Sequence, residues 1–456
     1  MFDHPENLLI PLPEDVLRAK HAGEFELCLR LIDRKLASPR TSEMLKARLE
    51  YEKQTLPRLI KRYPYDREKA LEVAKKRISG FTEEELDEAE LEGQVDYIFV
   101  KGEKRYVTHF AGSLLKFHPE WKDRELAPSK KDSPDLDEFI SGIKREKEIA
   151  YRFSVTSSLK VEDAAFESGE TYTVHRPVPA PSAQQAAGDI AINADADGII
   201  APADACHRTV CYKRTLDENA PFDVSFTYTS RLRYVRPFED VPHVVYPDVP
   251  APVNEDLEQQ YPHIVFTPYL TNLARQIAGN ETRPLYLARR VYDYITTHVR
   301  YSFMRSYSLI ENHSQYAAVN YKGDCGIQAV LFITLCRILG IPARWQSGLT
   351  IGYGTTGNHD WAMFYTREFG WLFADASFGG GARRSGRQER WNYYFGNLDP
   401  FRMVANRAYY KDFDPPKHFL RYDPCDSQDG EVETTKRGLD NLEYDKTDTV
   451  TEFIKL

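Results

Sequence analysis

A cysteine, a histidine and an aspartate stand in order in the second half of this chain, at spacings that could form a nucleophilic site. Cys325 opens a long apolar stretch, and His359 and Asp375 follow it in that order. A thiolate attacks carbonyl carbons, an imidazole accepts and returns protons, and a carboxylate can hold that imidazole in one tautomer. These three side-chain types therefore fit thiol-dependent acyl chemistry.

Cys325 stands at the start of a predicted helix. Residues 326–339 are apolar on nearly all sides, which predicts a helix buried in the centre of a domain, with Asp324 as a candidate cap. Backbone N–H groups and the positive end of the helix dipole favour a thiolate in the first turn. We therefore expect a lowered pKa for the Cys325 thiol, whereas Cys336, deeper in the helix, is expected to be inert.

Two predicted strands, NHDWAMFYT and GWLFADAS, carry His359 and Asp375 and are joined around residues 367–370. In an antiparallel pair, two odd-numbered residues share a face only if the connecting loop has an odd number of residues. A loop of three or five residues, or a bulge, would therefore place the two side chains together. A metal site on the same three residues is the alternative, but it lacks a closely spaced chelating pair.

The runs GDC, GIPAR, NHDW and GWLFADAS, in this order, resemble the transglutaminase-like superfamily, a branch of the papain-like cysteine enzymes. The resemblance covers residues 262–380, and residues 391–430 are similar to the C-terminal extension of bacterial members. It implies a papain-like core in which Cys325 is the nucleophile, His359 the base and acid, and Asp375 the orienting residue.

Two positions depart from the family pattern. Asp360 replaces the usual small residue between the histidine and the tryptophan, and Asp375-Ala376-Ser377 replaces the usual Asp-x-Thr. The extra carboxylate of Asp360 could change the charge preference for substrates. Arg383 and Arg384, in GGARRSGRQER, are further candidates for holding an acidic substrate, although a solvated loop is the favoured interpretation.

The resemblance leads us to expect a cysteine protease or amidase that hydrolyses peptide or amide bonds through an acyl-enzyme thioester. A protein-glutamine transglutaminase is the alternative. A silent interaction module is a third possibility, opposed by the presence of all three triad residues. The backbone N–H of Cys325 is expected to supply one oxyanion-hole donor, and Asn320 or Tyr301 could supply the other.

The charge, the first residues and the cysteine content of the chain indicate which partners and which cellular compartment to expect. Sixty basic and 69 acidic residues give a net charge of −9, which argues against nucleic acid or an anionic membrane as the main partner. The chain begins without a signal-like segment and has no apolar run of membrane-spanning length, so we expect a cytoplasmic protein. Six cysteines in 456 residues are too few for a disulfide scaffold, and they include no C-x2-C pair, so we expect no structural zinc site. We also expect no cofactor.

One other segment has the spacing of a ligand site. NADADGIIAPAD, residues 193–204, resembles an EF-hand calcium loop, but its twelfth position is Asp204 rather than glutamate. Pro202 would also break the exit helix. A turn between strands is therefore the favoured interpretation.

We expect a multidomain α+β fold, in which the core follows a β-sandwich-like region and a mainly helical N-terminal region. The sandwich is predicted by FDVSFTYTSRLRYV, where alternate residues from Phe222 to Tyr234 are apolar over most of a long strand. A proline-rich joint, PDVPAPV, separates it from the core. The expected regions are an N-terminal helical part with a hairpin, 1–130; the sandwich, 131–250; the catalytic core, 251–415; and an irregular C-terminal tail, 416–456.

Overall fold

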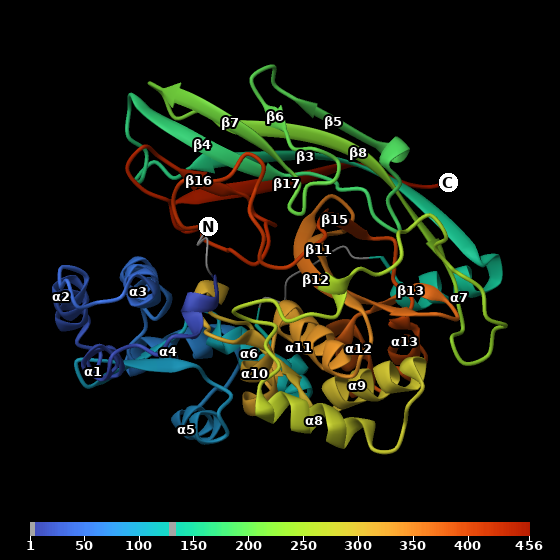
Figure 1. The fold of residues 1–456 in the computed structure, drawn as a ribbon, viewed down its shortest axis with the longest axis horizontal. Helices are drawn as coiled ribbons and strands as arrows, with labels where there is room; N and C mark the ends of the chain where they lie inside the picture. Colours follow the sequence, from blue (N-terminus) through green and yellow to red (C-terminus); the bar gives the residue numbers. More distant parts are fainter. Residues whose placement is uncertain (1–4, 127–133) are drawn as a thin grey trace.

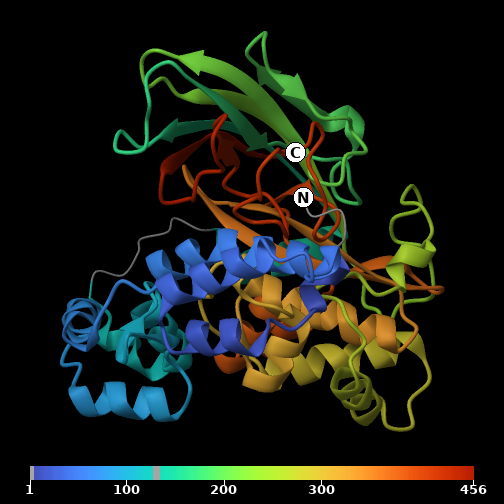
Figure 2. The same cartoon turned by 60° about the vertical axis from the view of Figure 1, so that its left-hand side comes forward.

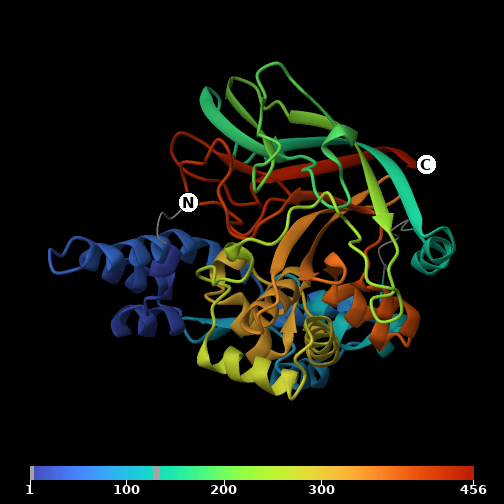
Figure 3. The same cartoon turned by 45° about the vertical axis from the view of Figure 1, so that its right-hand side comes forward.

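Three parts make up the computed structural model, which describes residues 5–126 and 134–456 (Figure 1). A group of N-terminal helices lies beside a core of helices and strands, and a β-sandwich lies above the core in this view. Figures 2 and 3 show the same layers after rotation, with the sandwich on one side and the helices on the other. The α+β fold is thus confirmed, while the expected boundary at residue 130 lies outside the described residues.

The N-terminal part is helical and encloses a hydrophobic cluster of its own. The expected hairpin is present, and Thr82 and Glu85 form a capping box at the start of α5. None of the helices in the described ranges is long and apolar enough to cross a membrane. The elements are α1 (Glu14–His21), α2 (Phe25–Leu36), α3 (Glu43–Arg62), α4 (Arg67–Arg77), α5 (Glu83–Leu91), β1 (Tyr97–Val100), β2 (Glu103–Tyr106) and α6 (Phe110–Phe117).

The sandwich consists of two four-stranded sheets with strand orders β16-β4-β7-β6 and β17-β3-β8-β5. Alternate residues of β8, from Phe222 to Leu232, are buried, as the period-two pattern predicts. The elements are α7 (Leu136–Glu146), β3 (Glu148–Val161), β4 (Glu170–Pro177), β5 (Ile190–Ala194), β6 (Ile199–Ile200), β7 (Thr209–Leu216), β8 (Phe222–Arg233), β16 (Glu431–Glu433) and β17 (Tyr444–Lys455).

The prediction of an irregular tail over residues 416–456 is wrong. Its residues form β16 and β17, and β17 pairs with β3 over nearly the whole length of both strands, with Lys455 opposite Tyr151. The two strands are far apart in the chain, so no local pattern links them. The sandwich is therefore completed by the last strand of the chain.

Buried charges tie the segment before β16 to the sandwich. The carboxylate of Glu431 accepts hydrogen bonds from Lys417 Nζ at 2.7 Å and from Arg421 Nε at 3.1 Å, and all three side chains are buried. Burial alone would raise the pKa of Glu431, but the two cations outweigh it and lower the pKa to about 2. The carboxylate therefore stays charged in the folded protein at neutral pH.

Glu431→Gln is expected to lower the free energy of unfolding by about 3–5 kcal/mol, because two buried cations lose their counter-charge. A folded-state pKa of about 2, below the ordinary 4.5, means that this stabilisation is present above pH 4.5 and is lost as the pH falls towards 2. Urea unfolding at several pH values measures both effects. Glu239→Gln, in an exposed ion pair with Arg236, is the control and should change little; equal losses for both variants would contradict the prediction.

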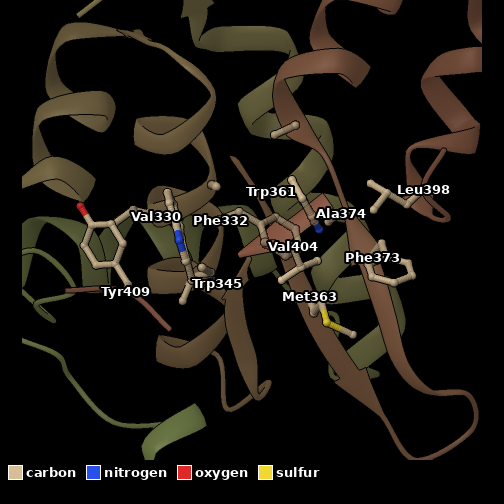
Figure 4. Packing of buried hydrophobic residues seen from close by; sticks show 14 of the residues in the cluster. Val330, Phe332, Trp345, Trp361, Met363, Phe373, Ala374, Leu398, Val404 and Tyr409 are labelled. Atoms are coloured by element: carbon tan, nitrogen blue, oxygen red, sulfur yellow. The ribbon is translucent and has the colours of Figure 1, made fainter. Parts of the chain in front are cut away.

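The core packs helices against a five-stranded sheet of order β14-β13-β12-β11-β15. Figure 4 shows part of its interior, where Val330 and Phe332 of α11 belong to the same buried cluster as Trp345 and Trp361 of the sheet. The elements are α8 (Pro268–Ala278), α9 (Pro284–His298), β9 (Arg300–Tyr301), α10 (His313–Asn320), β10 (Lys322–Gly323), α11 (Cys325–Ile338), β11 (Ala343–Ile351), β12 (Thr356–Thr366), β13 (Gly370–Ala374), α12 (Ala376–Arg384), α13 (Gln388–Tyr393), β14 (Phe395–Gly396) and β15 (Arg402–Asn406).

Candidate active site

Cys325 is the first residue of α11, as the sequence predicts. The Asp324 side chain caps the helix by accepting a hydrogen bond from the Ile327 N–H at 3.2 Å. The Tyr307 hydroxyl donates to the same carboxylate at 2.5 Å. Cys325 is 9% exposed, so its thiol lies just below the surface.

The hairpin that carries His359 and Asp375 has a loop of odd length. Thr366 opposes Gly370, which leaves three residues, 367–369, in the loop. The two side chains therefore share a face, and His359 Nε2 lies 2.7 Å from Asp375 Oδ2. The predicted pairing of the imidazole with the carboxylate is confirmed.

Arg402 of β15 reinforces this pair from the far side. It contacts Asp375 Oδ2 and also binds Asp399 at 2.7 Å, and all of these side chains are buried. Burial alone would raise the pKa of Asp375, but Arg402 and His359 outweigh it and hold that pKa well below its usual range. Burial lowers the pKa of His359, an effect that Asp375 opposes. No local sequence pattern marks Arg402 as part of the site.

Asp375 also has a structural role at the end of β13. Its Oδ1 accepts hydrogen bonds from the Phe378 N–H at 2.9 Å and from the Ser377 hydroxyl at 3.1 Å, so it caps α12. The prediction of a solvated loop over residues 380–390 is wrong, because α12 and α13 occupy most of that segment. One carboxylate thus both orients His359 and starts a helix.

The Cys325 thiol does not follow the expected pattern. In the part of the chain that the structure describes, its hydrogen bond goes to Asp360 Oδ2, at 3.1 Å, rather than to His359. His359 and Asp360 are successive residues of β12, so their side chains leave the strand in opposite directions. Burial, followed by the nearby carboxylates of Asp360 and Asp324, raises the pKa of the thiol well above its usual range. The expected lowered thiol pKa is therefore wrong for this arrangement, because desolvation and two acids oppose the helix dipole.

Asp360 lies in a buried group of acids. Gln428, from the segment before β16, donates to Asp360 Oδ1 at 2.5 Å and to the His359 carbonyl oxygen at 3.0 Å. Burial, with the neighbouring Asp324, raises the pKa of Asp360 to about 7. Asp360 is only 4% exposed. It faces the thiol rather than an open surface, which opposes a direct role in selecting substrates by charge.

The other candidate ligand residues lie away from the imidazole–carboxylate pair. Arg383 stacks over Trp391, with 4.6 Å from its guanidinium carbon to the ring centroid. Arg384 is half-buried, and burial lowers its pKa to about 10. Neither guanidinium hydrogen-bonds Cys325, His359 or Asp375 within the described residues.

The EF-hand-like segment is a turn that leads from β5 in one sheet to β6 in the other. Its carboxylates at Asp195 and Asp197 both bind Arg214, each with a contact of 2.7 Å. The arginine supplies the positive charge that calcium would otherwise bring. The contacts favour the turn that the sequence indicated.

Gly326, the second residue of α11, has no room for a side chain. A Cβ atom there would lie 2.3 Å from the Tyr307 hydroxyl oxygen and 2.8 Å from Asp360 Oδ2. Gly326→Ala is therefore expected to displace both groups and to destabilise the fold by about 1–3 kcal/mol. Gly381→Ala, in open space within α12, is the control and should be stabilising by about 0.5–1 kcal/mol. Thermal unfolding of both variants measures the difference, and equal shifts would contradict the crowding argument.

Part of the core matches a known protein family. Residues 271–376 match the family model described as the transglutaminase-like superfamily. This segment belongs to that superfamily. The match contains Cys325, His359 and Asp375, and it ends just after the third of them.

The transglutaminase-like core has distant likenesses among solved structures. A proposed cysteine protease from Cytophaga hutchinsonii is 16% identical, with a TM-score of 0.43, and the match covers 68% of this chain and 91% of that one. The periplasmic domain of TgpA from Pseudomonas aeruginosa is 15% identical, with a TM-score of 0.28, covering 58% and 98%. No curated protein matches the chain. Such distant likenesses do not bear on the reaction.

Proposed function

We propose that this protein is a thiol-dependent enzyme that hydrolyses peptide or amide bonds, with Cys325, His359 and Asp375 as its triad. The observation that carries the proposal is the 2.7 Å contact between His359 Nε2 and the buried Asp375 carboxylate. His359 directly precedes Asp360 in β12, and the Asp360 carboxylate accepts a hydrogen bond from the Cys325 thiol. A nucleophile at the start of α11, a base on β12 and an orienting acid at the start of α12 fit acyl transfer.

In this proposal the thiol must first leave Asp360 and approach His359, a rearrangement that is needed because these two neighbours point away from each other on β12. Because Nε2 is bonded to Asp375, Nδ1 is the nitrogen that accepts the thiol proton. The thiolate attacks the substrate carbonyl carbon, and the carbonyl electron pair moves onto oxygen. Collapse of this intermediate expels the amine, which takes the proton from His359, and a thioester remains. Water, deprotonated by His359, then attacks the thioester, releases the acid and restores the thiol.

Two groups can stabilise the negative oxygen of the intermediate. The backbone N–H of Cys325, in the first turn of α11, has no helical partner and is one donor. The Tyr301 hydroxyl lies within hydrogen-bonding reach of the Cys325 side chain and is the second donor in this proposal. Asn320, the other sequence candidate, is exposed and donates its side-chain amide to the Tyr316 carbonyl oxygen at 2.9 Å, which opposes that role.

The reaction class is tested by incubating a proteome-derived peptide library with the unsubstituted chain and with Cys325→Ala, in the presence of an isotope-labelled primary amine. Hydrolysis yields new peptide termini or deamidated glutamine, and transamidation yields amine adducts, all visible by mass spectrometry. We expect hydrolytic products only with the unsubstituted chain. Adducts without hydrolysis would support the transglutaminase alternative, and identical product lists for both proteins would overturn the proposed chemistry.

A further inference from the structure

Three buried side chains with metal-binding atoms meet outside the triad: His263, His313 and Cys425. One ligand atom from each lies within 4.8 Å of the other two. The three come from the loop before α8, from the first residue of α10 and from the segment before β16. Their wide separation in the chain hides this group from any search for closely spaced ligands, which explains why the sequence predicted no metal site.

His263 is the least satisfied member of the group. It is 2% exposed, and neither ring nitrogen makes a well-formed hydrogen bond among the described residues. Buried polar groups in native proteins are nearly always paired, since an unpaired one loses its hydration without compensation. A buried imidazole without a well-formed hydrogen bond points to a ligand, and a second imidazole and a thiol offer further ligand atoms within 4.8 Å.

His313 is held in the orientation of a metal ligand. Its Nε2 lies 2.9 Å from the Tyr307 carbonyl oxygen, so Nε2 carries the proton and Nδ1 holds the acceptor electron pair that a metal would need. Nδ1 lies on the side of Cys425, with Sγ at 4.0 Å, and it accepts a hydrogen bond from the Tyr409 hydroxyl. A carbonyl that fixes the outer nitrogen while the inner one faces the ion is the usual second-shell arrangement.

We propose that His263, His313 and Cys425 bind a divalent cation of the zinc class, with the Tyr409 hydroxyl placed to complete a four-coordinate site. Two imidazoles and a thiolate are donors that zinc and similar borderline-soft ions prefer. Binding releases the thiol proton of Cys425 to solvent and forms a metal–sulfur bond without any redox change. The ion would join the C-terminal segment to the helical core.

The two imidazole rings must reorient for this to happen. They now stack, with centroids 3.6 Å apart and planes within 5°. The electron pair of an imidazole nitrogen lies in the ring plane, so parallel stacked rings cannot both direct a pair at one ion. We assign the turn to His263, because both nitrogens of His313 are held, by the Tyr307 carbonyl oxygen and the Tyr409 hydroxyl, whereas neither nitrogen of His263 makes a well-formed hydrogen bond within the described chain.

The test uses the full chain carrying Cys325→Ala, so that the catalytic thiol cannot bind the ion. The protein is stripped with a chelator, and Co²⁺ or Zn²⁺ is added back. We expect about one ion per chain and, with Co²⁺, a thiolate-to-metal charge-transfer band in the near ultraviolet. Cys425→Ser should abolish the band, and His263→Gln should weaken binding at least tenfold.

Cys211→Ser is the matched control, since Cys211 is also buried and its Sγ lies 3.7 Å from His175 Nε2, but that pair has no third ligand among the described residues. It should bind metal normally. Failure of the folded Cys325→Ala chain to retain either ion, or a band that survives in Cys425→Ser, would overturn the site. If Cys425→Ser does not fold, the test rests on His263→Gln. An unchanged affinity of that variant for the metal ion would also overturn the site. Metal content is measured independently of turnover, so failure of the acyl chemistry would leave this result intact.

Discussion

Asp375→Asn is expected to lower turnover by about 10³- to 10⁴-fold, because His359 loses the carboxylate that fixes its tautomer and stabilises its protonated form. The pKa of His359, already lowered by burial, should fall further without Asp375. The imidazolium then supports the thiolate less well, so alkylation of Cys325 by iodoacetamide should require a higher pH. Steady-state turnover and alkylation rates against pH measure the two effects.

The same substitution should also reduce stability, since Asp375 faces Arg402 and caps α12. Asp399→Asn is the matched control, because it removes the other carboxylate of Arg402 and leaves the His359–Asp375 contact in place. We expect it to lower the melting temperature but to preserve most of the turnover. If both variants lose turnover equally and keep the alkylation profile of the unsubstituted chain, Asp375 is a structural residue and the triad reduces to Cys325 and His359.

The second large effect is expected at Asp360. Asp360→Asn should move the alkylation midpoint of Cys325 to lower pH by at least about one unit, which is roughly a tenfold faster reaction at neutral pH. The carboxylate accepts the thiol proton in a hydrogen bond and repels the thiolate, and both effects, added to burial, raise the thiol pKa. The amide carries no charge and relieves the repulsion.

In the unsubstituted chain, protonation of Asp360 should lower the pKa of the Cys325 thiol, as Asp360→Asn does. The pKa of Asp360 is raised to about 7, so the group is neutral below that pH and charged above it. The repulsion of the thiolate is therefore weakest on the acidic side, and the gain from Asp360→Asn should grow as the pH rises through 7. Cys206, the only partly exposed free cysteine in the described chain, serves as an internal reference whose rate should not change. An unmoved Cys325 midpoint would mean that burial alone sets the thiol pKa.

Local sequence patterns determined the parts of the site that depend on neighbouring residues. Asp324 before an apolar run predicted the cap and the start of α11, since capping needs only the next three residues. Strand alternation predicted that His359 and Asp375 share a face if the hairpin loop has an odd number of residues, and the three-residue loop of the β12–β13 hairpin meets that condition. The long strand β8 followed from its period of two for the same reason.

Tertiary structure alone decided the contacts between distant segments. Arg402 meets Asp375 from another strand, and Gln428 reaches Asp360 from the segment before β16. The thiol bonds Asp360 instead of His359 because the packing of α11 against the sheet sets its direction, and the surrounding burial reverses the pKa shift expected from the helix terminus. The last strand closes the sandwich by pairing with β3, which is far from it in the sequence. Such contacts depend on how complete elements pack, and no short run of residues encodes them.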